Sequence, residues 1–227
     1  MDILHRDDDL LVLNKAPGVL SQPDGTGDAD VVTLAKDKLR EEGESDPFIG
    51  LTHRLDRPTS GVLVVALSSE SARIISRQFR ERNVEKEYLA VVEGVLSGAG
   101  RWTDYIAKPG RAPRIVPADD PEGKRAVLSW QAVGQAEDRT LLKVQLETGR
   151  PHQIRLQCAE RGHHVLGDIR HGSSVEIDGR NLALHHAMLR LEHPSTHRME
   201  TFRAPLPAHW TRVLTPDLQR AVERATA

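Results

Sequence analysis

The stretch that decides the fold runs from residue 53 to residue 67 and reads HRLDRPTSGVLVVAL. Its second half, residues 61–67, is a nearly continuous apolar run, which is typical of a strand buried on both faces. In its polar first half, Asp56 stands between Arg54 and Arg57, and Pro58 follows directly. Because proline restricts the residue before it, the pattern predicts a rigid loop that presents a carboxylate beside a buried strand.

Two interpretations of Asp56 follow from these residues. Flanking arginines would keep a catalytic carboxylate ionised and could also bind phosphates. The alternative is an Asp–Arg ion pair that merely closes the loop at the start of the strand. This segment alone does not decide between them.

The rest of the chain mixes strands and helices without a regular βαβ alternation. Predicted strands cover residues 3–5, 10–14, 84–93, 126–135, 140–147 and 182–191, with a turn at residues 137–139. Predicted helices cover residues 31–41, a stretch that begins after Ser68 or Ser69, residues 152–161 and residues 217–225. Asp30 is the expected N-cap of the first helix, and Pro151 is expected to begin the third. This irregular order predicts an α+β fold.

Composition is that of an ordinary globular protein, with 38% hydrophobic and 28% charged residues and a net charge of −2. The charge is uneven, however. Residues 1–50 carry five Lys or Arg against twelve Asp or Glu, whereas residues 51–115 carry eleven against seven. The basic middle includes Arg73, Arg77 and Arg80 on one side of the second predicted helix. It predicts local binding of an anionic partner, although scattered solvated charge is the plainer reading.

Several functional classes are disfavoured. The single cysteine, Cys158, excludes an internal disulfide framework and a Cys-rich zinc module. No phosphate-binding P-loop, dinucleotide fingerprint or G-x-S-x-G nucleophile elbow is present. The adjacent pair His185 and His186 lies in a predicted strand, where neighbouring side chains point to opposite faces, so the two cannot easily chelate one metal. The sequence shows no signal peptide or membrane span. We therefore expect a cytoplasmic protein that uses ordinary side chains and no metal or cofactor.

Two further segments could carry chemistry. KEYLAVVEG (residues 86–94) places Tyr88 on a strand, where it could stack on a base, act as an acid or base, or simply fill the edge of the core. TGRPHQIRLQ (residues 148–157) puts Arg150, His152 and Arg155 near a helix start, which would attract anions. A capped, solvated helix is the alternative reading. GHHVLGD (residues 162–168) follows as a predicted tight return loop.

Taken together, in this order and spacing, these segments resemble the RluA-type family of RNA pseudouridine synthases. DDDLLVLNKAPGVL (residues 7–20) resembles the opening hairpin of that family. LALHHAMLRLEHP (residues 182–194) and RAPLP (residues 203–207) resemble its closing elements. The resemblance covers nearly the whole chain. It implies one catalytic domain over residues 1–227, with a mixed, largely antiparallel sheet in two lobes, flanking helices and a central active-site cleft.

The resemblance also implies residue roles. Asp56 is implied to be the essential catalytic residue, Tyr88 to lie against the target base and Arg155 to pair with Asp56. We further expect RNA contacts from the polar residues around these positions, namely Arg54, Arg57, Arg150, His152 and Gln153. No metal or organic cofactor is implied. The expected partner is structured rRNA or tRNA, which Asp56 would modify as nucleophile at the sugar or as base at its 2′ position.

Some features depart from the family pattern, and two other functions compete. Gln157 stands where many relatives have histidine, and His171 where many have tyrosine, so RNA contacts can differ. The small N-terminal RNA-binding domain of many relatives is expected to be absent, and a monomer is expected. The competing functions are a non-catalytic RNA-binding module on the same fold and a glycosidase-like hydrolase that uses Asp56 with Asp168.

Overall fold

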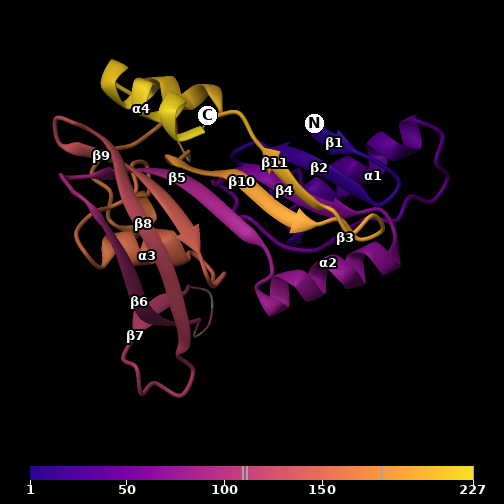
Figure 1. The fold of residues 1–227 in the computed structure, drawn as a ribbon, viewed down its shortest axis with the longest axis horizontal. Helices are drawn as coiled ribbons and strands as arrows, with labels where there is room; N and C mark the ends of the chain where they lie inside the picture. Colours follow the sequence, from indigo (N-terminus) through magenta and orange to yellow (C-terminus); the bar gives the residue numbers. More distant parts are fainter. Residues whose placement is uncertain (109, 111, 180, 227) are drawn as a thin grey trace. The chain divides into compact units, whose positions relative to one another are not determined.

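The computed structural model describes residues 1–108, 110, 112–179 and 181–226 (Figure 1). The chain forms two compact units. The first contains Met1–Lys86 and His186–Pro207, and the second contains Glu87–His185 and Ala208–Ala227. Each unit combines antiparallel strand pairs with helices, which confirms the predicted α+β class.

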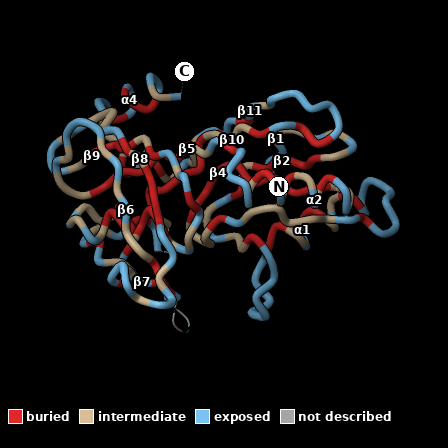
Figure 2. The backbone as a smooth tube through the Cα atoms, turned by 60° about the horizontal axis from the view of Figure 1, so that its bottom comes forward, coloured by how far each residue is buried: buried red, intermediate tan, exposed pale blue. Residues whose placement is uncertain are grey.

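Six strands supply the sheet of the first unit. They are β1 (Asp2–Arg6), β2 (Leu10–Lys15), β3 (Gly50–Leu51), β4 (Ser60–Ala66), β10 (Leu184–Glu192, whose first two residues belong to the second unit) and β11 (Met199–Arg203). The order is β1-β2-β4-β10, while β3 pairs with β4 and β11 with β10. β4 is buried throughout, as the apolar run predicts (Figure 2). The antiparallel register of β2 and β4 pairs Lys15 with Gly61, next to the HRLD segment.

Two helices complete the first unit. α1 (Val31–Glu41) is capped by Asp30, whose side chain accepts a hydrogen bond from Thr33 N, as the sequence predicts. α2 (Ser69–Glu81) is capped in the same way by Ser68, which accepts from Ser71 N. α2 lies along the sheet (Figure 1) and buries Ile75 in the core formed with β4 and β10. The remaining side chains of that cluster are Leu10, Val12, Val62, Val64, Ala66, Val84, Leu189, Leu191, Phe202 and Ala204.

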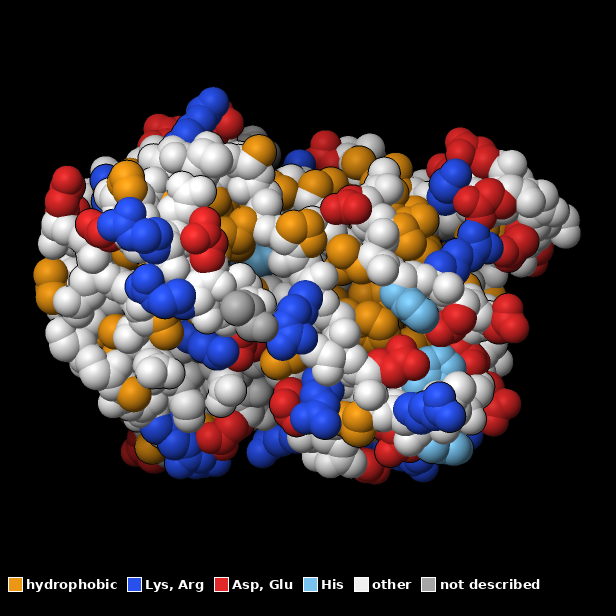
Figure 3. Space-filling model, turned by 45° about the horizontal axis from the view of Figure 1, so that its top comes forward, with side chains coloured by type: hydrophobic (Ala, Val, Ile, Leu, Met, Phe, Trp, Pro, Cys, Tyr) orange, Lys and Arg blue, Asp and Glu red, His pale blue; other side chains and the backbone are white. Residues whose placement is uncertain are grey.

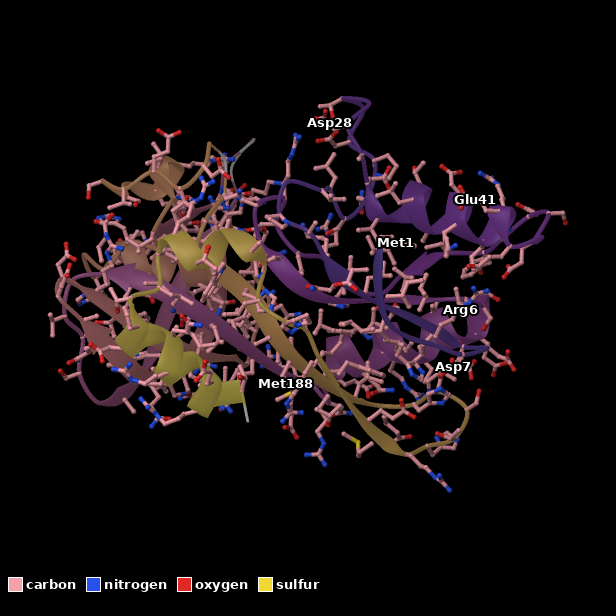
Figure 4. All side chains as sticks on the ribbon, turned by 90° about the horizontal axis from the view of Figure 1, so that it is seen from above. Met1, Arg6, Asp7, Asp28, Glu41 and Met188 are labelled. Atoms are coloured by element: carbon pink, nitrogen blue, oxygen red, sulfur yellow. The ribbon has the colours of Figure 1, made fainter. Side chains whose placement is uncertain are left out.

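A polar cluster holds the β1–β2 turn, whose Asp7 is labelled in Figure 4. Asp7 Oδ1 accepts from the backbone N–H groups of Asp9 and Leu10, and its Oδ2 lies 2.7 Å from His5 Nε2 and 3.1 Å from His193 Nε2. Burial raises the pKa of Asp7, but these hydrogen bonds outweigh burial and lower the pKa from 3.8 to about 2. The ionised carboxylate therefore stabilises the folded state.

We expect Asp7→Asn to lower the free energy of unfolding at pH 7 by on the order of 1–2 kcal/mol. Because the folded pKa lies below the unfolded value, this contribution is complete above about pH 4 and is lost as the pH falls toward 2. Urea unfolding from pH 2 to 7 measures it, and the exposed neighbour Asp8, changed to Asn, is the control. A difference between Asp7→Asn and wild type that stays constant over this range would contradict the assignment.

The second unit contains an antiparallel sheet in the order β5-β9-β8-β6-β7. Its strands are β5 (Glu85–Glu93, whose first two residues belong to the first unit), β6 (Ala99–Ala107), β7 (Arg114–Val116), β8 (Lys124–Ala136) and β9 (Arg139–Leu146). The predicted turn between β8 and β9 is confirmed, with Glu137 at φ 53°. α4 (Pro216–Thr226) packs on β8 (Figure 1), where Gly134 leaves room: a Cβ there would lie 2.5 Å from Ala221 Cβ.

The sequence predicts no strand over residues 99–107, yet β6 runs through them. Residues along its first half alternate between exposed and half-buried, so apolar periodicity is weak there. What fixes β6 is its long pairing with β8, in which Gly100 lies opposite Trp130. A Cβ at Gly100 would lie 3.0 Å from the Trp130 ring, so the absent side chain makes room for the indole.

The third predicted helix is shorter than expected. α3 spans Gln153–Ala159, and His152 before it adopts a left-handed conformation with φ 54°. The helix therefore begins after Pro151 and His152, not at the proline. With seven residues it provides only a short run of aligned peptide dipoles, which weakens the expected attraction of anions to its N-terminus. No helix in the described part of the chain is long and apolar enough to cross a membrane.

Candidate active site

The loop that carries Asp56 connects β3 to β4 and is fixed on both sides of that residue. Before Asp56, Ser21 Oγ donates to Leu55 O at 2.8 Å and accepts from Leu55 N at 3.1 Å. After it, Thr59 N donates to Asp56 O at 3.0 Å and closes a tight turn around Pro58. Asp56 itself is half-buried. The backbone is thus fixed while the carboxylate keeps access to its surroundings.

Lys15 holds the same loop from the end of β2. Its side chain is buried, 2% exposed, and Nζ donates to three main-chain carbonyls, those of Ala16 at 3.0 Å, Val19 at 2.8 Å and Arg57 at 3.1 Å. Burial lowers the pKa of Lys15 to about 7, against the opposing effect of the Asp56 carboxylate. The Asp56 carboxylate therefore favours the charged form of Lys15.

Arg57 is engaged within the first unit. Its Nε donates to Gly18 O at 2.9 Å, and its Nη1 lies 2.8 Å from Oδ2 of Asp28, which sits at the tip of the loop before α1 (Figure 4). Arg57 therefore has a structural role, which competes with the phosphate binding predicted for it. Arg54, two residues before Asp56, is exposed.

His53 anchors the start of the motif in the core. Its Nε2 accepts from Val64 N at 3.0 Å, and its ring stacks on Phe79 at 4.5 Å between centroids. Burial, reinforced by His186 and Lys86, holds the pKa of His53 well below its usual value, so the ring is neutral with its proton on Nδ1. Gly61 ends the motif at φ 112°, and a Cβ there would lie 2.2 Å from His186 O. The glycine is therefore required for close contact between β4 and β10.

Tyr88 and the return loop predicted at residues 162–168 belong to the second unit. Tyr88 lies on β5, 7% exposed, opposite Val144 of β9. The loop runs beside the same strand, where Glu93 N donates to His164 O at 2.8 Å and Leu166 N donates to Val91 O at 2.9 Å. One strand thus carries the tyrosine and fixes the loop that leads to Asp168.

Arg155 on α3 forms a buried ion pair with Asp168. Its Nε lies 2.7 Å from Asp168 Oδ2 and its Nη2 lies 2.7 Å from Oδ1, while the two side chains are 5% and 2% exposed. This is a side-on, bidentate pair that fixes the plane of the guanidinium. Asp168 is therefore committed to Arg155 and unsuited to the acid or base role that the glycosidase-like alternative requires.

Residues around the start of α3 are also anchored. Gln153 is 3% exposed, and its Oε1 accepts from Thr148 Oγ1 at 2.8 Å and from Arg150 N at 3.0 Å. Arg150 Nε donates to Arg125 O at 3.0 Å. His152 Nδ1 lies 2.8 Å from Nε2 of His171, the position at which the sequence departs from its relatives. Gln153 is thus built to shape the turn before α3, which argues against the direct RNA contact expected of it.

The predicted catalytic residues divide between the units, with Asp56 in the first and Tyr88 and Arg155 in the second. The pairing of Arg155 with Asp56 stays a prediction. The sequence does not predict the contacts of Lys15 or the ion pair of Asp168. A signal for Lys15 was present, since it ends the apolar run LLVLNK. Nothing in the sequence pairs Asp168 with an arginine thirteen residues earlier.

Among the residues that the structure describes, one group of side chains has the spacing of metal ligands. Atoms of Asp7, Asp9 and His193 lie within 4.8 Å of one another. However, His193 Nδ1 accepts from the backbone N–H groups of Ser195 and Thr196, so Nε2 carries the proton and faces Asp7 Oδ2. The Asp9 carboxylate accepts from the hydroxyls of Ser71 and Ser195. This pattern fits a hydrogen-bonded structural cluster better than a metal site.

Comparisons with known proteins agree on one family. A family model described as RNA pseudouridylate synthase matches residues 9–160. The ribosomal large subunit pseudouridine synthase D of Vibrio vulnificus is 34% identical over 221 residues, which cover 91% of this chain and 67% of that protein. The tRNA pseudouridine synthase C of Haemophilus ducreyi is 34% identical over 235 residues, which cover 92% of this chain and 93% of that protein.

A solved structure shows the same fold. The human RNA pseudouridylate synthase domain containing 4 superposes with a TM-score of 0.77 at 22% identity, and the match covers 98% of this chain and 92% of that chain.

Proposed function

The chain belongs to the RNA pseudouridylate synthase family, and from this premise we propose that it isomerises uridine in folded RNA with Asp56 as the catalytic carboxylate. Members of the family are isomerases that act on RNA. The observation that carries the residue assignment is the fixation of the Asp56 loop by Ser21, Lys15 and the Thr59 turn. A carboxylate held on a rigid loop next to a buried strand is preorganised for attack or proton transfer.

The reaction breaks the bond between ribose C1′ and uracil N1 and forms a bond between C1′ and uracil C5. The proton on C5 is released, N1 gains a proton, and the mass of the RNA does not change. The target uridine must first leave its base stack, which costs a few kcal/mol and least in a loop. Asp56 then acts as nucleophile at C1′ or as base at C2′. Both routes need an ionised, well-aimed carboxylate.

We assign supporting roles to Tyr88 and Arg155. Tyr88 would lie against the uracil ring, and Arg155 would orient the Asp56 carboxylate. Asp168 strengthens this assignment for Arg155, because its side-on pair uses Nε and one hydrogen of Nη2. A guanidinium has five N–H groups, of which this pair uses two, so its geometry is compatible with a second carboxylate at another edge.

The names of the relatives suggest two substrates, large-subunit rRNA and tRNA. We propose that one of these is modified in the cytoplasm, with Arg54 and Arg150 in contact with phosphates. The test incubates the protein with transcripts of each, labelled with tritium at uracil C5. Tritium release without release of free uracil is expected from one of them. Release of uracil would indicate hydrolysis, and stable binding without either product would indicate a binding module.

Activity should not depend on a bound metal. We expect tritium release from a short RNA that folds without magnesium to be unchanged, within about twofold, after exhaustive EDTA treatment. The reason is that, in the described part of the chain, the side chains with metal-ligand spacing are occupied by hydrogen bonds. Loss of activity that added zinc restores would show that a metal takes part.

A further inference from the structure

Acidic and basic side chains are mixed on the protein, so an RNA-binding surface depends on the charge of individual elements. The face shown in Figure 3 carries acidic and basic side chains interspersed, in keeping with a net charge of −2. Within the first unit, each of four arginines forms an ion pair with a carboxylate at 2.8–3.1 Å, namely Arg6, Arg40, Arg57 and Arg190. The arginines of α2 differ from these.

Arg73, Arg77 and Arg80 recur along α2 at spacings of four and three residues, and all three are exposed. Such spacing places side chains on one face of a helix. Within the described part of the chain, no carboxylate lies within 4.0 Å of the guanidinium of Arg77 or Arg80, and Arg73 has only Glu70 at 4.0 Å. This row of positive charge is therefore available to a partner.

Arg82 follows the helix directly and is also exposed. It caps α2 in the left-handed conformation at φ 64°, with its N–H bonded to Gln78 O and Phe79 O. Glycine is the usual residue at such a cap because it has no Cβ penalty. An arginine in this conformation carries the backbone strain that glycine avoids, so stability does not explain its presence. Arg82 also contributes to the lowered pKa of Lys86, after burial, which shows positive charges crowding together.

The opposite face of α2 is firmly attached, so the row has a fixed position. Ile75 is fully buried in the core. Gln78 joins the helix to the end of β10, since its Nε2 donates to Glu192 O at 2.7 Å and its Oε1 accepts from Glu192 N at 3.0 Å. The backbone that carries the row is therefore already ordered before binding, and only the side chains lose freedom.

We propose that Arg73, Arg77, Arg80 and Arg82, the α2 basic row, form a docking surface for the sugar–phosphate backbone of the substrate RNA. From residue 73 to residue 80 the helix rises by about 10 Å, so the three guanidinium groups can contact more than one phosphate of the same strand. Contacts of this kind position an RNA without reading its sequence. The inference rests on the proposed function, because it takes RNA as the substrate.

The test compares two triple variants that remove the same charge. Arg73→Gln, Arg77→Gln and Arg80→Gln are combined on α2, and Lys36→Gln, Lys38→Gln and Arg40→Gln are combined on α1 as the control. RNA affinity is measured against salt concentration. We expect the α2 variant to bind at least tenfold more weakly near 0.1 M salt, with a salt slope lower by about 2. The α1 variant should match wild type in affinity and in tritium release.

Arg82→Gly provides an independent test. Glycine relieves the left-handed strain, so the melting temperature should hold or rise by up to about 2–4 °C. RNA affinity should nevertheless fall, with a salt slope lower by about 1. A gain in stability together with a loss of binding cannot arise from misfolding.

The outcomes separate the docking surface from the proposed function. If wild type releases tritium but the α2 variant keeps wild-type affinity and slope, the docking surface is wrong and the function stands. If wild type releases no tritium from any RNA, the function itself fails. Row-dependent binding to phosphatidylserine vesicles, with unchanged RNA affinity, would assign the surface to a membrane and overturn the proposal.

Discussion

Asp56→Asn should abolish isomerisation, to below about 1% of the wild-type rate, while folding and RNA binding persist. Asparagine keeps the shape of the side chain but can act neither as an anion nor as a base. The loop should be unaffected, because the bonds that hold it involve the backbone of Leu55, Asp56 and Arg57. Tritium release under single-turnover conditions measures the rate, and a binding assay on the same preparation measures affinity.

The exposed Asp37 of α1, changed to Asn, controls for the loss of one negative charge. A second readout is specific to the site. The Asp56 carboxylate raises the pKa of Lys15, which is about 7, so its removal should lower that pKa further. Activity of Asp56→Asn above a few per cent of wild type would remove Asp56 from the catalytic role.

Arg155→Lys should lower the single-turnover rate by on the order of a hundredfold, although the charge is kept. Lysine cannot make the side-on pair that Nε and Nη2 make with Asp168, so the cation loses its fixed direction. Asp168→Asn should also lower the single-turnover rate, because the amide of asparagine has one acceptor oxygen where the guanidinium needs two. Both variants are measured by tritium release and by thermal unfolding.

The expected effect of Arg155→Lys on stability is larger than that of an exposed ion pair. An ion pair near a solvent-accessible cleft would contribute only about 1 kcal/mol. The pair is instead 5% and 2% exposed, so Arg155→Lys should lower the free energy of unfolding by about 1–3 kcal/mol and the melting temperature by about 3–10 °C. Ile154→Val, buried next to Arg155, provides a control of similar instability with the guanidinium intact. If that control loses activity equally, Arg155 is structural.

Local signals predicted much of the framework. Asp30 and Ser68 cap α1 and α2 as expected, because an N-cap is decided by a side chain and a backbone N–H only three residues apart. The apolar run at 61–67 became the fully buried β4, and the turn at residues 137 and 138 joins β8 to β9. β6 escaped prediction because its pattern is weak and its pairing with β8 spans many residues.

The same difference between local and long-range interactions applies to the roles of individual residues. The sequence by itself determined that Asp56 sits in a constrained loop before a buried strand, because proline and an apolar run act on their neighbours. It also determined the family, through motifs in a fixed order. Only the tertiary structure decided that Lys15 holds this loop by three carbonyls and that Arg155 pairs with Asp168. Burial and bidentate geometry depend on which segments fold together, and residues that are in contact in space can be distant in the sequence.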